Sequence, residues 1–229
     1  MEKYFTLLLQ HPLFAGIDRE SLRSLLGCLA AKTESFAKGD PVFMEGDRAG
    51  LIGFVLAGSV QIVRDDYYGN RSLLMIAETG EVFGEAYACA GLDAMPVSGY
   101  AAQDSKILWL ACRKMLTVCT NACIFHNALV QNLLQVVAQK NLILSRKIQF
   151  MSRKTTREKL MAYLLDQAKQ KGASEFTIPL DRQGLADFLG VERSAMSAEL
   201  GKLRAMGVLE SKGSKFQLLK EQLYAGENA

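Results

Sequence analysis

Long apolar runs and an export signal are both missing from this sequence of 229 residues. No stretch reaches the roughly 18 uncharged apolar residues that indicate a transmembrane helix. The N-terminal segment, residues 1–14, is apolar for a short distance but has no basic region before it and no small-residue cleavage site after it. These absences predict a cytoplasmic protein without a membrane span.

Catalytic spacings are also lacking. The two histidines, His11 and His126, have no Ser, Cys or paired carboxylate beside them at a recognisable catalytic spacing. The Gly80–Gly84 segment has two glycines but does not match a Walker or dinucleotide-binding loop. The five cysteines are scattered and odd in number, which favours reduced thiols over a disulfide framework. We therefore do not expect an enzyme.

The positive charge of the chain is concentrated in one segment. Residues 1–145 hold 12 Lys and Arg against 14 Asp and Glu, whereas residues 146–220 hold 15 against 8. The net charge is therefore −2 in the first segment and +7 in the second. A basic segment of domain size is typical of a protein that binds a polyanion, although a lysine-rich solvated surface is an equally good explanation of charge alone.

The chain divides by pattern into three regions. Residues 1–35 have leucines at helical spacings, and Gly39-Asp40-Pro41 ends that pattern. From 41 to about 110, short β-rich runs alternate with glycine turns, which predicts an antiparallel sandwich or barrel. The runs are 42–44, 54–56, 60–63, 73–76 and 107–110.

Residues 121–151 have the pattern of one long helix. Seven positions spaced alternately by four and three residues form a heptad seam: Val130, Leu134, Val137, Asn141, Leu144, Ile148 and Met151. Such a seam faces a partner helix, and a single asparagine within it fixes register, so the pattern favours a parallel homodimer. The alternative is a long helix packed on its own domain.

Residues 181–210 predict a helix-turn-helix. Asp181 is placed to cap a first helix, Gly190 to end it, and Glu192 or Arg193 to begin a second helix with Met196, Leu200 and Leu203 on its buried face. The second helix then exposes Arg193, Ser194, Ser197 and Ala198, where side chains of this motif enter the major groove of double-stranded DNA. Arg182, Gln183 and Lys202 are suited to phosphate contacts. The segments 208–210 and 216–219 predict a β-hairpin wing.

In combination, these features resemble the CRP/FNR superfamily of bacterial regulators over residues 5–220. The markers are Glu45-Gly46-Asp47, Leu56–Val60, Gly80–Glu85, the long helix and Gly190–Val208. The resemblance implies an α+β protein: a sensor domain over 1–120 with a double-stranded β-helix (a jelly-roll-like β-roll), a dimerisation helix over 121–152 and a winged helix-turn-helix over 153–229. It also implies a palindromic operator and RNA polymerase as a further partner.

The resemblance places an effector pocket after Phe83-Gly84-Glu85. Relatives that bind cyclic nucleotides hold the phosphate with an arginine and a hydroxyl residue, and those positions are here Met95 and Pro96. Methionine cannot neutralise a phosphate, so we expect no cyclic AMP binding of the usual kind. Ser98 remains as a polar donor. Lys140 and Asn141 correspond to positions on the dimer helix that touch the nucleotide, although a solvated lysine and a register-fixing asparagine are the simpler interpretation.

Metal and haem sensing are not expected. Iron–sulfur members of the superfamily carry an N-terminal cysteine cluster, whereas Cys28 stands alone before Cys89. Cys119 and Cys123, with His126 nearby, have the spacing of half a metal or redox site, but buried inert thiols are the preferred interpretation, and haem ligation by His11 or His126 is equally disfavoured.

The alternative function is a ligand-binding regulatory subunit that acts through a protein partner.

Overall fold

The computed structural model describes residues 1–68, 71–117 and 124–219. The chain forms two compact units, residues 1–139 and 140–229, which are described separately. Across the described parts, no helix is both long enough and apolar enough to span a membrane.

The first unit begins with short helices that form one wall of its core. They are η1 (Glu2–Tyr4), α1 (Phe5–Gln10), η2 (Pro12–Phe14) and α2 (Arg19–Cys28). Asp18 caps α2, because its carboxylate accepts the backbone N–H groups of Glu20 and Ser21, both at 2.9 Å. Helix α2 ends at Cys28, which is earlier than the leucine pattern of residues 1–35 predicted.

The prediction of helix over residues 1–35 was wrong at its C-terminal end, because residues 32–36 form a strand. Ala30 has a positive φ of 51°, which turns the chain out of the helix. Strand β1 (Lys32–Phe36) then pairs antiparallel with β8 (Ser105–Ala111), with Thr33 opposite Leu108. A partner more than 70 positions away (Thr33 to Leu108) thus decides the local structure, which a local pattern does not show.

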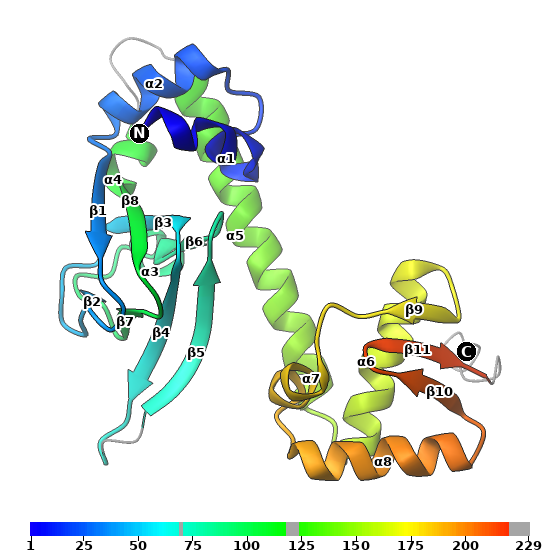
Figure 1. Ribbon diagram of the computed structural model, residues 1–229. Helices are drawn as coiled ribbons and strands as arrows, with labels where there is room; N and C mark the ends of the chain where they lie inside the picture. The colour runs from blue at the N-terminus through cyan, green and yellow to red at the C-terminus, as the bar shows by residue number, and fades with distance from the viewer. Residues whose placement is uncertain (69–70, 118–123, 220–229) are drawn as a thin grey trace. The chain divides into compact units, whose positions relative to one another are not determined.

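Two four-stranded antiparallel sheets form the β-roll of the first unit (Figure 1). One has the order β1-β8-β3-β6 and the other β2-β7-β4-β5. The remaining strands are β2 (Pro41–Phe43), β3 (Leu51–Ala57), β4 (Ser59–Asp65), β5 (Arg71–Glu78), β6 (Val82–Phe83) and β7 (Ser98–Ala101), with short helices α3 (Glu85–Cys89) and α4 (Cys112–Leu116). The five β-rich runs predicted from sequence all lie in or overlap these strands.

Strand β3 is buried on both faces. Phe54 and Leu56 belong to a core shared with the N-terminal helices, whereas Val55 points into a second core between the sheets. The alternation explains why residues 52–56 are apolar without interruption. The sheet that contains β3 is therefore covered on one face by the N-terminal helices and on the other by the second sheet of the roll.

Helix α5 (Ile124–Met151) confirms the predicted long helix and crosses the division between the units. In the first unit, Leu129, Leu133 and Val136 are buried in the core shared with the N-terminal helices. Asn132 Nδ2 donates to the carbonyl oxygens of Leu13 (3.1 Å) and Ala15 (2.9 Å). The helix is thus held along one side by both packing and hydrogen bonds.

The heptad seam of α5 lies mostly on the exposed side of the helix. Leu134, Leu144 and Ile148 are 69, 56 and 59% exposed, and Met151 is 40% exposed. Val137 is partly buried against the core of the first unit, whereas the buried residues of that core on α5 are Leu129, Leu133 and Val136, so the seam and the packing stripe overlap at Val137 and diverge toward the C-terminal end of the helix. An exposed heptad stripe of leucine and isoleucine is an apolar surface on which a second helix can pack.

The second unit combines the C-terminal end of α5, which contributes Phe150 to its core, with further helices and a small sheet. It contains α6 (Thr156–Lys171), β9 (Glu175–Thr177), α7 (Arg182–Leu189), α8 (Arg193–Ala205), β10 (Leu209–Lys212) and β11 (Lys215–Leu218). Helix α6 begins with a reciprocal capping box between Thr155 and Glu158. The predicted wing hairpin is confirmed as β10 and β11, and β9, which the sequence reading did not include, adds a third strand beside β11.

Candidate functional site

Helices α7 and α8 form the predicted helix-turn-helix. Asp181 Oδ1 accepts the backbone N–H of Gly184 at 2.7 Å and so caps α7. Gly190 ends α7 in the left-handed conformation, with φ of 60°, and a Cβ there would lie 3.0 Å from the Met151 side chain. Both the conformation and the close approach therefore favour glycine at this turn.

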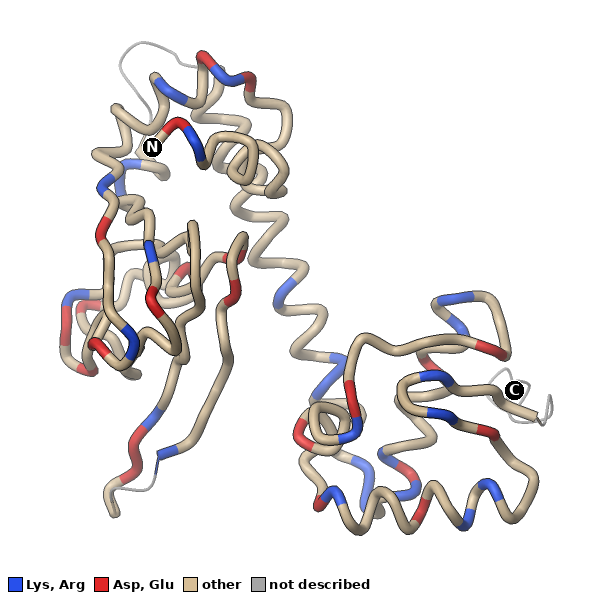
Figure 2. The backbone as a smooth tube through the Cα atoms, viewed as in Figure 1, with Lys and Arg blue, Asp and Glu red and all other residues tan. Residues whose placement is uncertain are grey.

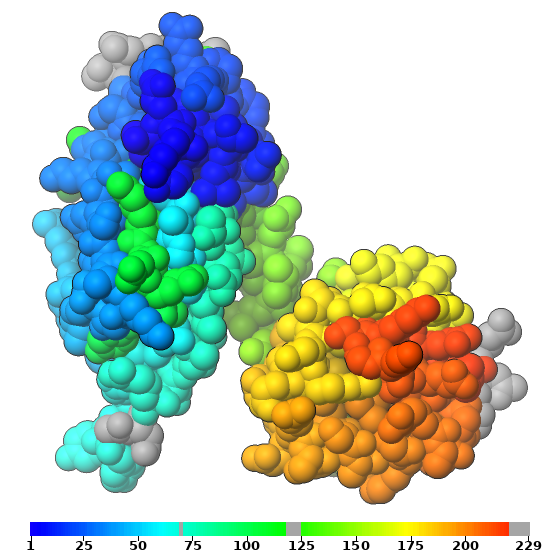
Figure 3. All heavy atoms as spheres, in the orientation of Figure 1, coloured from blue at the N-terminus to red at the C-terminus, as the bar shows by residue number. Residues whose placement is uncertain are grey.

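Helix α8 has one buried and one exposed face, as predicted. Met196, Leu200 and Leu203 are at most 3% exposed and pack into the core of the second unit. Their burial fixes the rotation of α8, and the predicted base-reading positions are all exposed: Arg193, Ser194, Ser197 and Ala198. In the space-filling view, α8 lies along the surface of its unit (Figure 3). This exposed face is called the α8 face below.

The first turn of α8 contains no acidic residue. The N-cap residue Glu192 makes no side-chain cap hydrogen bond, so the backbone N–H groups of the first turn are left uncapped by a side chain and, with Arg193, can attract an anion, while the Glu192 carboxylate opposes that attraction. Further along, Lys202 Nζ is 2.6 Å from Glu199 Oε1, so its ammonium group is partly neutralised on the helix surface. Lys202 is exposed, as a phosphate contact requires, and its ion pair would have to be exchanged for that contact.

Arg182 is placed differently from the other predicted DNA-binding residues. Its side chain is half-buried, with Cζ 4.8 Å from the centre of the Phe216 ring and Nη2 donating to Ser211 Oγ at 3.1 Å. Burial, and the nearby Arg204 guanidinium, lower the pKa of Arg182 below its usual value. Arg182 thus joins α7 to the wing sheet, a role that sequence spacing did not reveal because Ser211 is 29 positions away.

Gln183 is exposed on the first turn of α7. Its Nε2 donates to Asp187 Oδ1 at 2.8 Å, one helical turn away. The side chain is accessible to a phosphate, but the amide group is already used within the helix. A DNA contact by Gln183 or Arg182 stays a prediction.

The basic residues of the second unit are spread over the C-terminal end of α5, both ends of α6, the start of α7, α8 and the wing (Figure 2). A depression of about 450 Å³ at the wing is lined by Arg204, Lys212 and Lys215, together with Glu175 and Glu210. Lys215 forms an ion pair with Glu175, so the wing is basic but partly neutralised. Cationic residues of the kind expected in a polyanion-binding segment therefore lie on α8 and the hairpin that follows it, and also over residues 146–159.

The first unit contains the predicted effector turn. Gly84 precedes α3 with φ of 77°, and a Cβ there would lie 3.2 Å from the Leu51 carbonyl oxygen. Glu85, the first residue of α3, is 6% exposed. Glu85 thus places a buried carboxylate at the turn where the resemblance expects an effector pocket.

Met95 and Pro96 lie where a phosphate partner was sought. Met95 is 7% exposed and packs in the core between the sheets, while its backbone exchanges hydrogen bonds with the 46–47 turn. Ser98 Oγ accepts the backbone N–H of Glu45 at 3.0 Å and is buried. The residues present therefore do not fit a cyclic phosphate, because neither Met95 nor Pro96 supplies a charge or a hydrogen-bond donor.

Lys140 and Asn141 belong to the second unit. Asn141 is exposed, and its Oδ1 accepts a hydrogen bond from Ser145 Oγ at 3.2 Å. Contact between these two residues and an effector stays a prediction.

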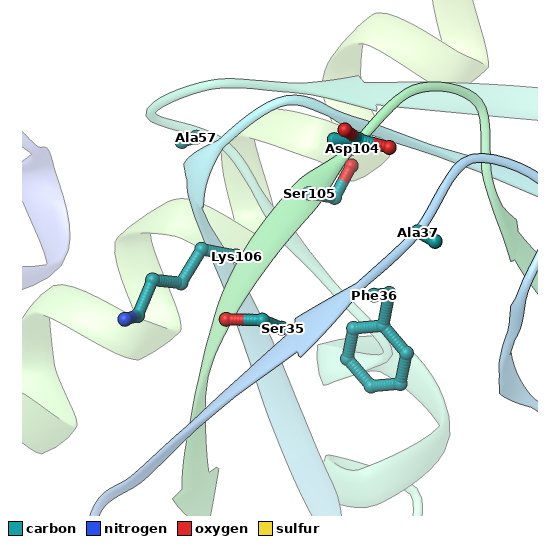
Figure 4. Close-up of a pocket in the computed structure, with 7 residues that line it drawn as sticks. All are labelled: Ser35, Phe36, Ala37, Ala57, Asp104, Ser105 and Lys106. Carbon is teal, nitrogen blue, oxygen red and sulfur yellow. The ribbon is translucent and has the colours of Figure 1, made fainter.

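A shallow depression of about 390 Å³ lies elsewhere on the first unit, between β1 and β8 (Figure 4). It is lined by Ser35, Phe36, Ala37, Ala57, Asp104, Ser105 and Lys106, and none of the effector candidates is among them. Asp104 Oδ1 accepts the Lys38 backbone N–H at 2.9 Å, and Ser105 Oγ bonds the Ser59 backbone. These polar side chains therefore bond the protein's own backbone.

The histidines and cysteines in the described parts of the chain form no metal-binding cluster. Within the parts of the chain that the structure describes, no three His, Cys, Asp or Glu side chains are placed to hold a metal ion. His11 Nδ1 accepts the Leu13 backbone N–H at 3.1 Å, and its ring contacts Phe54, so its role is structural. Cys119 and Cys123 lie outside the described residues.

One cysteine pair was missed by sequence reasoning. Cys89 Sγ and Cys112 Sγ are 3.8 Å apart, although the residues are 23 positions apart. Cys28 is exposed on α2. No spacing signal marks the Cys89–Cys112 pair, because it is the sheet that brings α3 and α4 together.

Comparison with known proteins relates both units to described families. Residues 33–121 match the cyclic nucleotide-binding domain family, and residues 158–223 match the Crp-like helix-turn-helix domain family. A segment of 91 residues is 32% identical to the nitrogen fixation regulation protein FixK of Azorhizobium caulinodans. That match covers 37% of this chain and spans about a third, 34%, of FixK.

Solved structures share the fold. CprK in complex with OCPA has a TM-score of 0.62 at 19% identity, and the match covers 89% of this chain and 92% of CprK. The c-di-GMP-responsive regulator CLP of Xanthomonas campestris has a TM-score of 0.57 at 20% identity, covering 89% of this chain and 100% of CLP. At these identities the likeness concerns the fold.

Proposed function

Since this chain belongs to the CRP/FNR family, we propose that it is a sequence-specific DNA-binding transcription regulator that acts as a homodimer. The α8 face is the observation that carries the proposal. One side of α8 is buried in the core, and the other presents a cation and hydroxyl groups at its N-terminal half. The proposed function is non-catalytic and belongs in the cytoplasm, with the DNA.

The chemistry of the α8 face suits the major groove. The Arg193 guanidinium can donate two parallel hydrogen bonds to a guanine, whereas Ser194 and Ser197 can donate or accept at several bases. Lys202, the wing lysines, Gln183 and the backbone N–H groups of α8 are suited to phosphates, which position the protein without reading sequence. Ala198 contributes no hydrogen bond, so the operator should differ from that of relatives with arginine at this position.

Dimerisation sets the form of the operator. Two recognition helices related by two-fold symmetry read a palindrome whose half-sites lie about 10 base pairs apart. The exposed seam of α5 supports a parallel pair of helices as the dimer interface. RNA polymerase is the further partner that a transcription regulator of this family would contact.

The experiment that tests the function is selection of binding sites by the purified full chain from a pool of random DNA, with and without a metabolite extract. Enrichment of a palindrome is expected. Enrichment that depends on the extract would identify an effector requirement. If neither condition enriched DNA, and the protein instead captured a partner protein, the regulatory-subunit function would replace the one proposed here.

Replacing Arg193 and Lys202 together by alanine is expected to lower affinity for the selected operator while dimerisation stays unchanged. A bidentate arginine–guanine contact accounts for about 1–3 kcal/mol of discrimination per half-site. The operator affinity should therefore fall by about 10-fold or more, and sequence preference should weaken at one base pair of each half-site. Fluorescence anisotropy with operator and mutated operators measures both effects.

The matched control is Lys169→Ala with Lys171→Ala, at the end of α6. Both lysines are exposed and lie in the same unit as α8. Their replacement removes the same two positive charges as the Arg193 and Lys202 double variant. Operator affinity of the control should change only slightly and uniformly across sequences. Equal losses in the two double variants would contradict the assignment of α8 as the reading helix.

We further propose that the effector is not cyclic AMP bound in the usual manner. Calorimetry of the full chain with cyclic AMP should give no dissociation constant tighter than about 100 μM, because the buried phosphate would lack a cationic partner at Met95 and Pro96. Tight binding with one nucleotide per chain would refute this prediction and require that another cation reach the phosphate.

A further inference from the structure

We propose that Cys89 and Cys112 form a reversible dithiol–disulfide site that links α3 to α4. Their sulfur atoms are 3.8 Å apart in the reduced protein, a contact that joins two segments 23 positions apart. The pair lies within the first unit, where Cys112 belongs to the main core and Cys89 packs against it.

The geometry requires only a small movement. A disulfide has its sulfur atoms about 2.05 Å apart, so the two sulfurs must approach by roughly 1.8 Å. Cys89 is the last residue of α3, a helix of five residues, and Cys112 is the first residue of α4. Rotation of the two side chains and a slight shift of this short helix supply the movement, whereas two long packed helices would resist it.

The two thiols differ in access, which sets the order of reaction. Cys89 is partly exposed, whereas Cys112 is 2% exposed. An oxidant in solution therefore meets Cys89 first. Burial prevents Cys112 from reacting directly, but its sulfur already touches that of Cys89.

The two steps balance with a small disulfide as oxidant. The Cys89 thiolate attacks one sulfur of the small disulfide, forms a mixed disulfide and releases one thiol. The Cys112 thiolate then attacks Cys89 Sγ and releases the second thiol. Two protein thiols lose two electrons and two protons, and the small disulfide becomes two thiols.

The contact between the two sulfur atoms, rather than a favourable pKa, carries the two steps. The hydrogen bond with Cys112 and burial raise the pKa of Cys89, which disfavours the thiolate that makes the first attack, so the first step should become faster as the pH rises. Once Cys89 is in the mixed disulfide, Cys112 Sγ, already in contact with Cys89 Sγ, is in place to displace the leaving group.

The disulfide would act on the first helix after the candidate effector turn. Helix α3 starts at Glu85, directly after Gly84, and ends at Cys89. Fixing its end to α4 restricts movement of the whole short helix, including Glu85. Oxidation would thereby stiffen one wall of the predicted pocket without the formation of any new contact inside it.

The test uses the full chain with Cys28→Ser, Cys119→Ser and Cys123→Ser, so that only the proposed pair remains. The folded protein is incubated with oxidised glutathione, and its mass and free thiols are followed. Both thiols should disappear together, the mass should fall by two hydrogen atoms, and a reductant should restore both. A peptide containing Cys89 joined to Cys112 should appear on digestion without reductant, and amide hydrogen exchange in α3 should slow.

Two further variants in this background identify the roles. Cys112→Ala, which keeps the buried position small and apolar, should stop at a stable glutathione adduct on Cys89. Cys89→Ser should stay unmodified in the folded state, because Cys112 is inaccessible. Circular dichroism confirms that each variant is folded.

Other results would overturn the proposal. If the pair oxidised only in urea, or if the parent protein kept a stable glutathione adduct on Cys89, the contact would be one of packing. Equal modification of Cys112 in the Cys89→Ser variant would likewise exclude a site in which Cys89 reacts first.

Discussion

Leu144→Glu combined with Ile148→Glu is expected to convert the protein from a dimer to a monomer and to abolish tight operator binding. Both side chains are more than half exposed in the single chain, on the heptad stripe of α5. In a parallel dimer, these positions lie opposite their symmetry mates, so each substitution places two carboxylates together in an apolar seam. Each unpaired buried charge costs several kcal/mol, which exceeds what the removed apolar contacts contributed.

The expected loss of operator affinity is at least about 100-fold, since a monomer engages one half-site and loses the gain from simultaneous binding. Sedimentation velocity measures the oligomeric state, and anisotropy with a full palindrome and with a single half-site measures binding. Affinity for the half-site should change little, because the α8 face lies outside the altered seam.

Gln135→Glu with Gln149→Glu is the matched control. Both glutamines are exposed on α5 but lie off the seam, so the same charge is added to the same helix. This variant should remain a dimer. A wild-type protein that sedimented as a monomer at the concentrations at which it binds a palindrome would contradict the seam assignment, as would a seam variant that stayed dimeric.

Phe216→Ala is expected to unfold the second unit selectively. The Phe216 ring is 1% exposed and stacks against the Phe176 ring, with ring centres 6.2 Å apart. The Arg182 guanidinium also lies over the Phe216 ring, with Cζ 4.8 Å from its centre. Truncation of a buried phenylalanine lowers the free energy of unfolding by about 3–5 kcal/mol. Here it also removes the surface on which a half-buried cation rests, so the cost should lie toward the upper end.

The single tryptophan allows the two units to be followed separately. Trp109 lies in β8 of the first unit, with its indole N–H 2.9 Å from Glu34 Oε2 and its ring against Phe83. In urea, helical circular dichroism of the Phe216→Ala variant should show an early transition from the second unit. Trp109 fluorescence should keep its wild-type midpoint.

Gln217→Ala is the control in the same strand. Gln217 is exposed on the opposite face of β11, and its replacement should change the free energy of unfolding by less than about 0.5 kcal/mol. If fluorescence and circular dichroism shifted together for Phe216→Ala, the two units would unfold as one, and the division at residue 139 would not describe the energetics.

The helix-turn-helix was predictable because its determinants are local. A cap at Asp181, a left-handed glycine at 190 and apolar residues spaced three and four apart lie within one short segment, and each restricts the backbone by itself. The same is true of the seam of α5, whose periodicity is visible without any knowledge of what it faces. Its exposure was not fixed by the pattern alone, because a long helix packed on its own domain stayed open as the alternative.

Features that depend on distant partners were not predictable. Residues 32–36 have no strong strand pattern, and their structure is set by pairing with β8. Arg182 was assigned a phosphate because it begins a DNA-binding motif, whereas in the fold its guanidinium also meets Phe216 and Ser211 of the wing. The Cys89–Cys112 contact has the same origin, since neither residue differs in local context from an ordinary core cysteine.

The two hydrogen bonds from Asn132 determine more than the attachment of α5. A helix turns by about 100° per residue, so any rotation about its axis would redirect every side chain on the seam. Because Asn132 Nδ2 is bonded to carbonyl groups on both sides of the Phe14 position, the N-terminal segment sets the rotational phase of the helix. The first fifteen residues therefore act as an angular reference for α5 where it packs on the first unit, and the proposed dimer would take the direction of its seam from contacts near the N-terminus.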